Sequence, residues 1–134
     1  MPLKVVIDTN IWISYFINAR SDYLVSWIID HPVEIYTSAV LVDEIEEVLL
    51  RPKFKKEFPF PVKDFINLHK QTCTMVNVTR EYNLAPDPGD NFLFDLCQKI
   101  NAQCLVTSDK KPLSYFPAFP LEIISFNELR NKFR

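Results

Sequence analysis

Short apolar runs rich in β-branched residues alternate along this chain with segments of helical periodicity. The expected strands cover residues 3–7, 33–36, 75–78, 103–107 and 121–125. Helices are expected over 11–17, 22–30, 38–50, 62–72 and 126–133, and from a turn at 85–89 to about residue 101. Because strands separated by helices form right-handed βαβ units, the pattern predicts a parallel sheet covered by helices on both faces. The functional site of such a sheet is expected at the carboxyl ends of its strands.

Length and composition limit the alternatives. The chain has 134 residues and is 48% hydrophobic and 24% charged, as expected for one globular domain spanning residues 1–134. It contains a single glycine, Gly89, and therefore lacks the glycines that a phosphate-binding loop or a nucleophile elbow requires. A net charge of −2 gives no basic field that would attract nucleic acid over the whole surface.

The cysteine and histidine patterns do not indicate a zinc site or a disulfide framework. Three cysteines without CxxC spacing and two scattered histidines favour a reducing, cytoplasmic location. No apolar run approaches the ~18 residues of a membrane span. A carboxylate, Asp8, comes too early for a signal peptide.

Two predicted strands run directly into an acid. Residues 3–7 are followed by Asp8, and residues 103–107 are followed closely by Asp109. Each carboxylate is therefore expected where the site of a parallel sheet lies. The alternative is that each acid only caps the next helix.

Two further acids lie close to apolar helix faces. In the helix from Ser38, Glu44 falls in one row with Val40 and Val48, whereas the other acids of this helix, 43, 46 and 47, point outward. In the later helix, the apolar stripe extends back by one turn to Asp90. Asp87 is expected to cap this helix, with proline at its first position.

Four acids can thus converge at one end of the sheet: Asp8, Glu44, Asp90 and Asp109. Packed carboxylates raise one another's pKa, so such a group is costly without a cation. Oxygen ligands without cysteine or histidine select Mg²⁺ or Mn²⁺. The chemistry that fits is metal-assisted hydrolysis of a phosphodiester.

At these residues the chain resembles a PIN domain. The opening Val-Val-Ile-Asp8-Thr-Asn10, the helix around Glu44, the segment Asp87-Pro-Gly-Asp90 and Leu-Val-Thr-Ser108-Asp109 match its motifs in order and approximate spacing. The similarity covers nearly the whole chain and is greatest to the small prokaryotic branch that contains toxins of toxin–antitoxin pairs.

The resemblance implies a three-layer α/β/α fold with a five-stranded parallel sheet and a Mg²⁺- or Mn²⁺-dependent endoribonuclease. It implies metal ligation by the four acids and hydrogen-bonding support from Asn10 and Ser108. The family often has glycine at position 108 and a more acidic turn before Asp90. Whether Asp87 or Asp90 faces the metal is open, and the helical stripe favours Asp90.

Two segments are candidates for binding macromolecules. The basic stretch Arg51, Lys53, Lys55 and Lys56, with interleaved phenylalanines, can track an RNA backbone, or it can be a solvated loop. The very apolar segment 11–17 predicts an interface with an antitoxin or a second copy if part of it is exposed, and core packing is the alternative.

Two other functions compete with the nuclease. A catalytically silent PIN-like scaffold would bind RNA or protein without cutting. A phosphoryl-transfer or receiver domain fits less well, because Asn10 occupies the place of a second aspartate and no acid follows the third strand. Asp95 is expected to be solvated, and Gly89 is expected to supply a special backbone angle before Asp90.

Overall fold

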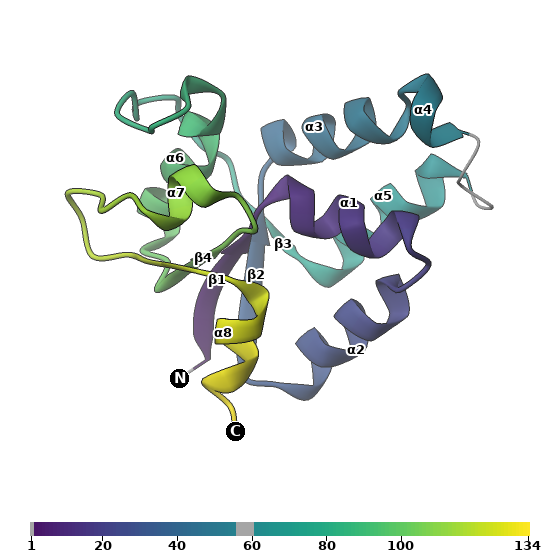
Figure 1. Cartoon of the computed structure of the whole chain (residues 1–134), viewed down its shortest axis with the longest axis horizontal. Coiled ribbons are helices and arrows are strands. Elements are labelled where there is room, and N and C mark those ends of the chain that lie inside the picture. The colour runs from purple at the N-terminus through teal and green to yellow at the C-terminus, as the bar shows by residue number, and fades with distance from the viewer. Residues whose placement is uncertain (1, 56–60) are drawn as a thin grey trace.

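The computed structural model describes residues 2–55 and 61–134, and within them five strands form one parallel sheet in the order β3-β2-β1-β4-β5 (Figure 1). The strands are β1 (Leu3–Ile7), β2 (Val33–Thr37), β3 (Thr74–Met75), β4 (Cys104–Val106) and β5 (Glu122–Ile124). The predicted parallel sheet is therefore confirmed.

The centre of the sheet is also the centre of the core. Val5 of β1 pairs with Ile35 of β2 on one side and with Cys104 of β4 on the other. All three side chains are buried. Since both faces of a central parallel strand are covered, its sequence is a continuous apolar run instead of an alternating one.

Helices cover both faces, which gives the predicted three layers. They are α1 (Thr9–Ile17), α2 (Ser21–Asp30), α3 (Ala39–Leu49), α4 (Pro52–Lys55), α5 (Val62–Thr72), α6 (Asn91–Ile100), α7 (Lys110–Leu113) and α8 (Phe126–Asn131), with a 3₁₀ turn, η1, at Pro88–Asp90. Figure 1 shows α6 and α7 on one side of the sheet and α1, α2, α3 and α5 on the other. None of the described helices is long and apolar enough to cross a membrane.

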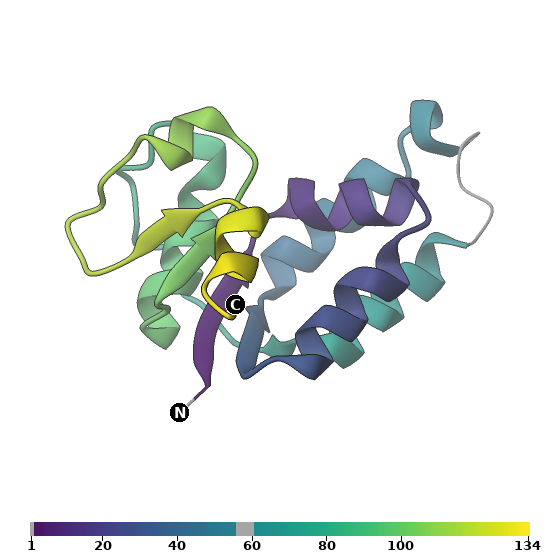
Figure 2. The ribbon, with the colours of Figure 1, turned by 60° about the horizontal axis from the view of Figure 1, so that its bottom comes forward.

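The C-terminal helix α8 packs back against the helices that follow β1 (Figure 2). A capping box between Ser125 and Glu128 starts this helix. The ring of Phe126 then meets Tyr15 at 5.6 Å and Trp27 at 5.2 Å, both edge-on. These contacts tie the end of the chain to α1 and α2.

Three local predictions differ from the structure. The third strand comprises only Thr74–Met75, at the exposed edge of the sheet. The Val76 N–H still donates to the Thr37 carbonyl at 2.9 Å, and the chain then leaves β2. Helix α7 was not predicted from its four-residue segment, which contains a proline. The sequence of α5 predicts Phe65, Leu68 and Thr72 on one side of the helix, but its buried residues are Phe65, Ile66 and His69.

The apolar segment 11–17 is core packing. Ile11, Trp12, Ile13 and Phe16 are all buried. The Phe16 ring stacks on Phe65 of α5 at a centroid distance of 4.7 Å. This segment therefore offers no exposed apolar surplus for an antitoxin or a second copy.

Candidate functional site

The carboxyl ends of β1 and β4 lie side by side and bring the first two predicted acids together. Ile7 pairs with Val106, and the Asp8 N–H continues the ladder to the Val106 carbonyl at 2.8 Å. Asp109 comes shortly after β4 as the N-cap residue of α7. The chain runs from β1 to β2 on one side, and β4 lies on the other, so this is a switch point in strand order.

Asp8 is a buried carboxylate with a fixed partner. It is 5% exposed, and the Thr107 hydroxyl, itself fully buried, donates a hydrogen bond to its Oδ2 at 2.8 Å. Desolvation raises the pKa of Asp8, and the charge of Asp109 raises it further, whereas the Thr107 bond and the nearby N–H groups of Thr9 and Asn10 lower it. The carboxyl group is thus oriented before any ligand arrives.

Glu44 reaches the same region from α3. The Ser38 hydroxyl caps this helix by accepting from the Leu41 N–H at 3.3 Å, as predicted. Glu44 is half-buried, while the acids at 43, 46 and 47 are exposed, also as predicted. Desolvation, then the charges of Asp8 and Asp90, raise the pKa of Glu44 to about 7.

Asp90 approaches from the turn before α6. Desolvation raises its pKa to about 6, and the charges of Asp8, Asp87 and Asp109 contribute. Its Oδ2 is buried and has no hydrogen-bond partner among the described residues. A buried, unpaired carboxylate oxygen is costly, and a bound cation would satisfy it.

Helix capping explains only one of the acids. Asp8, Asp90 and Asp109 are the N-cap residues of α1, α6 and α7, yet none of their side chains accepts a capping hydrogen bond. The Asp87 carboxylate does cap, accepting from the Gly89 N–H at 2.9 Å. Asp87 is therefore occupied in the turn, and Asp90 is the acid of this segment whose pKa is raised by desolvation and then by the charge of Asp8.

The four predicted acids are electrostatically coupled, but they do not stand as a ready-made metal site. Asp8 interacts with Glu44, Asp90 and Asp109, and Asp90 also interacts with Asp109. Across residues 2–55 and 61–134, no three His, Cys, Asp or Glu side chains are grouped closely enough to hold an ion. The donor atoms and the unpaired Asp90 oxygen fit Mg²⁺ or Mn²⁺ in chemical type.

The supporting hydrogen bond comes from a residue that the sequence analysis did not single out. Asn10 and Ser108 are exposed, and their side chains make no hydrogen bond to the described residues. Thr107 instead donates to Asp8 and accepts from the Asp109 N–H at 3.1 Å. Its position directly after a buried strand and two residues before Asp109 is the signal that could have identified it.

Asp95 is buried, and the expectation that it is solvated is wrong. It is 6% exposed, and its Oδ1 accepts from the Glu81 N–H at 2.9 Å and the Tyr82 N–H at 2.6 Å. The segment after β3 has no strand partner here, so its N–H groups need another acceptor. Asp95 provides it from α6.

Gly89 does not adopt a left-handed backbone angle, so that expectation is also wrong. A Cβ atom at this position would meet Oδ1 of Asp87 at 3.3 Å. Lack of space beside the capping carboxylate, and not a special φ, is the reason that glycine suits this turn.

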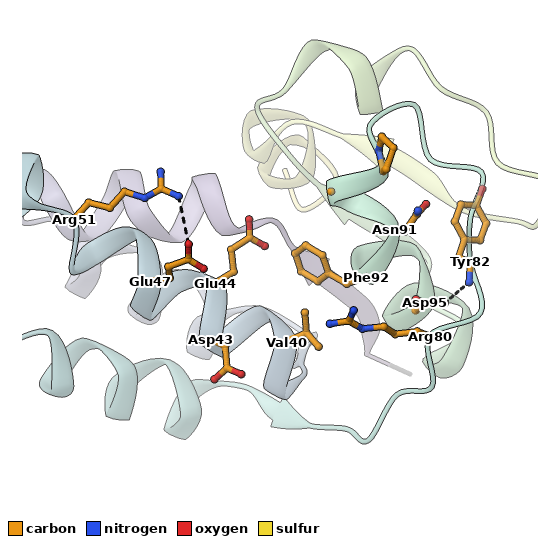
Figure 3. A pocket seen from close by; sticks show the side chains of 12 residues that line it. Val40, Asp43, Glu44, Glu47, Arg51, Arg80, Tyr82, Asn91, Phe92 and Asp95 are labelled. Atoms are coloured by element: carbon orange, nitrogen blue, oxygen red, sulfur yellow. Dashed lines mark hydrogen bonds and ion pairs between the residues drawn. The ribbon is translucent and has the colours of Figure 1, made fainter.

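A pocket of about 570 Å³ opens beside Glu44, between α3, α6 and the segment that Asp95 holds. Figure 3 shows Arg80 and Phe92 pointing into it, with Glu44 at its edge. Of the predicted basic stretch, Arg51 lines this pocket and pairs with Glu47 at 3.9 Å.

The rest of the basic stretch contributes less to the pocket. Lys53 lies over the Phe54 ring at 5.0 Å. Lys55 ends α4, and Lys56 lies outside the described residues.

The chain was compared with protein families, with curated proteins and with solved structures. The family model for the PIN domain matches residues 4–111. An uncharacterized protein of Methanocaldococcus jannaschii is 27% identical over 118 residues, covering 85% of this chain and 76% of that protein. The crystal structure of VapBC2 from Rickettsia felis bound to a DNA fragment from their promoter includes a chain with a TM-score of 0.60 and 16% identity, covering 90% of this chain and 98% of that chain.

Proposed function

The chain belongs to the PIN domain family, and from this premise we propose that it is a Mg²⁺- or Mn²⁺-dependent endoribonuclease, forming one domain over residues 1–134. The observation that carries the proposal is that Asp8, Glu44 and Asp90 come together from three separate segments, with an oxygen of Asp90 that is buried and unpaired among the described residues. A fold keeps like charges together at a cost unless they serve a cation.

Asp8, Glu44, Asp90 and Asp109 would hold the ion. A bound divalent ion supplies an activated water and stabilises the leaving oxygen of a phosphodiester. The chain's own contribution is orientation: Thr107 holds Asp8 by a 2.8 Å hydrogen bond and ties it to the backbone of Asp109. The carboxylates of Glu44 and Asp90 complete the negative rim.

We further propose that the protein is the toxin of a toxin–antitoxin pair and acts on RNA in the cytoplasm, with an antitoxin as its partner. The support is the shared fold with a chain of VapBC2 from Rickettsia felis, a protein solved in complex with promoter DNA. The similarity extends over nearly the full length of both chains.

The test is RNA cleavage by purified protein with Mn²⁺, with Mg²⁺ and with EDTA. We expect metal-dependent cleavage that Asp8→Asn reduces by at least about 100-fold, since even outer-shell changes cost 10- to 100-fold. Asp22→Asn, an exposed acid on α2, is the matched control and should cleave normally. Cleavage that is equal in EDTA, or no cleavage with either metal, would refute the nuclease.

A silent scaffold is separated from the enzyme by metal binding. Calorimetric titration with Mn²⁺ should give heat in the native chain and none in Asp8→Asn. Absence of Asp8-dependent binding would favour a scaffold that binds RNA or protein without cutting.

A further inference from the structure

We propose that the pocket between α3 and α6 is a nucleotide subsite in which Arg80 holds a phosphate and Phe92 stacks against a base. The inference rests on the proposed nuclease function, because it concerns how a strand of nucleic acid reaches the acids. It gives Arg80 and Phe92, which lie outside the acid cluster, a role in binding the substrate.

Arg80 is a cation available to a ligand. Its exposed side chain extends into the pocket (Figure 3), and it makes no ion pair or side-chain hydrogen bond with the described residues. The second arginine of the pocket, Arg51, is paired with Glu47 at 3.9 Å. A guanidinium group presents a fork of donors that matches a phosphate.

The backbone that carries Arg80 is fixed by Asp95. This buried carboxylate accepts from two successive N–H groups, those of Glu81 at 2.9 Å and Tyr82 at 2.6 Å. Hydrogen bonds to a charged acceptor are stronger than neutral ones. Asp95 is therefore a positioning residue that holds the backbone next to Arg80 at the pocket.

Phe92 supplies an aromatic surface between Arg80 and the acids. Its ring is half-buried and lies between Glu44 and Arg80 in Figure 3, with Val40 below it. Aromatic side chains beside a cation are the usual platform for single-stranded nucleic acid. The volume of about 570 Å³ is in the range of small-ligand sites.

The pocket adjoins the acid cluster, since Glu44 lines the pocket and is one of the proposed metal ligands. Its α3 wall also carries Asp43 and Glu47, which repel a phosphate. Arg80 is the cation that offsets this repulsion, so losing it should weaken binding strongly. A phosphate held by Arg80 would place the adjoining nucleotide toward the acids.

The experiment measures binding of a fluorescein-labelled single-stranded RNA of mixed sequence by anisotropy, in the Asp8→Asn background so that the RNA is not cut. Arg80→Gln should weaken binding by about 10- to 100-fold. It should also reduce the slope of log affinity against log salt by about 0.7, the value for one lost phosphate contact on a single strand. Arg80→Lys should keep the slope and lose part of the affinity.

Phe92→Leu keeps an apolar side chain but removes the aromatic face, and it should weaken binding by about 5- to 100-fold with an unchanged salt slope. Lys70→Gln removes one exposed charge on α5, outside the pocket, and is the matched control. Equal affinity and equal salt slope in Arg80→Gln and Lys70→Gln would overturn the subsite. Cleavage by the native chain is scored separately, so failure of the nuclease and failure of the subsite are distinguishable.

Discussion

Glu44→Gln should make the metal-free protein more stable at neutral and alkaline pH. The pKa of Glu44 rises from 4.5 to about 7 in the folded protein, first through desolvation and then through the charges of Asp8 and Asp90. Folding therefore favours the protonated carboxyl group. Its stabilising effect is full below pH 4.5 and is lost as the pH rises through about 7.

The size of the effect follows from the two pKa values. The interval from 4.5 to about 7 corresponds to about 3 kcal/mol of unfolding free energy. Because Glu44 is only half-buried, screening by water reduces this to about 1–2 kcal/mol. Glutamine has the shape of the protonated acid, so the variant should recover this amount above pH 7 and almost none at pH 4.5.

The assay is urea unfolding in EDTA at pH 4.5, 6 and 8. Glu46→Gln, an exposed acid on the same helix, is the control and should change stability by less than about 0.5 kcal/mol at every pH. Taking the difference between variant and native chain removes the contributions of other titrating groups. A Glu44→Gln protein no more stable than the native chain at pH 8 would refute the coupling of the acids.

Two further predictions concern buried polar groups. Thr107→Val removes the hydroxyl that donates to Asp8, and we expect the unfolding free energy, measured with urea, to fall by about 1–3 kcal/mol. Thr107→Ser keeps a hydroxyl and should retain most of the native stability. An equal loss of stability in both variants would contradict a role for this hydrogen bond. Burial, then the charge of Lys70, lowers the pKa of His69 to about 4. Since the unfolded chain takes up this proton near pH 6.5, stability should fall by up to about 3 kcal/mol from pH 6.5 to 4, and a His69→Gln curve of the same slope would refute this.

The positions of the strands and the choice of the four candidate acids could be inferred from the sequence because each depends on local pattern. The apolar run ending at Asp8 and the helical row through Val40 and Glu44 need only periodicity to be recognised. Pairing at a sheet edge is different. Residues after Met75 are apolar enough for a strand, but a strand also requires a partner along its whole length, and β2 ends at Thr37.

Asp95 shows why some polar residues cannot be placed from sequence. On the helical wheel it falls away from the apolar stripe, and a solvated acid is the natural expectation. The structure buries it because a separate segment crosses α6 and brings the N–H groups of Glu81 and Tyr82 onto it. The course of that segment is a tertiary property, set by where the chain leaves β3, and no local pattern encodes it.

The same tertiary logic explains how the acid cluster is tolerated. In a parallel sheet, each strand-to-helix junction delivers a helix N-terminus to one edge, and Asp8, Asp90 and Asp109 occupy three such positions. A helix N-terminus offers about 0.3–1 kcal/mol to a nearby carboxylate. That is too little to neutralise the group, because the pKa of Asp90, at the N-terminus of α6, still stands at about 6. The remaining negative charge of the carboxylates must be neutralised by protons or by a bound cation. Protons and the cation therefore compete for the same carboxylate oxygens.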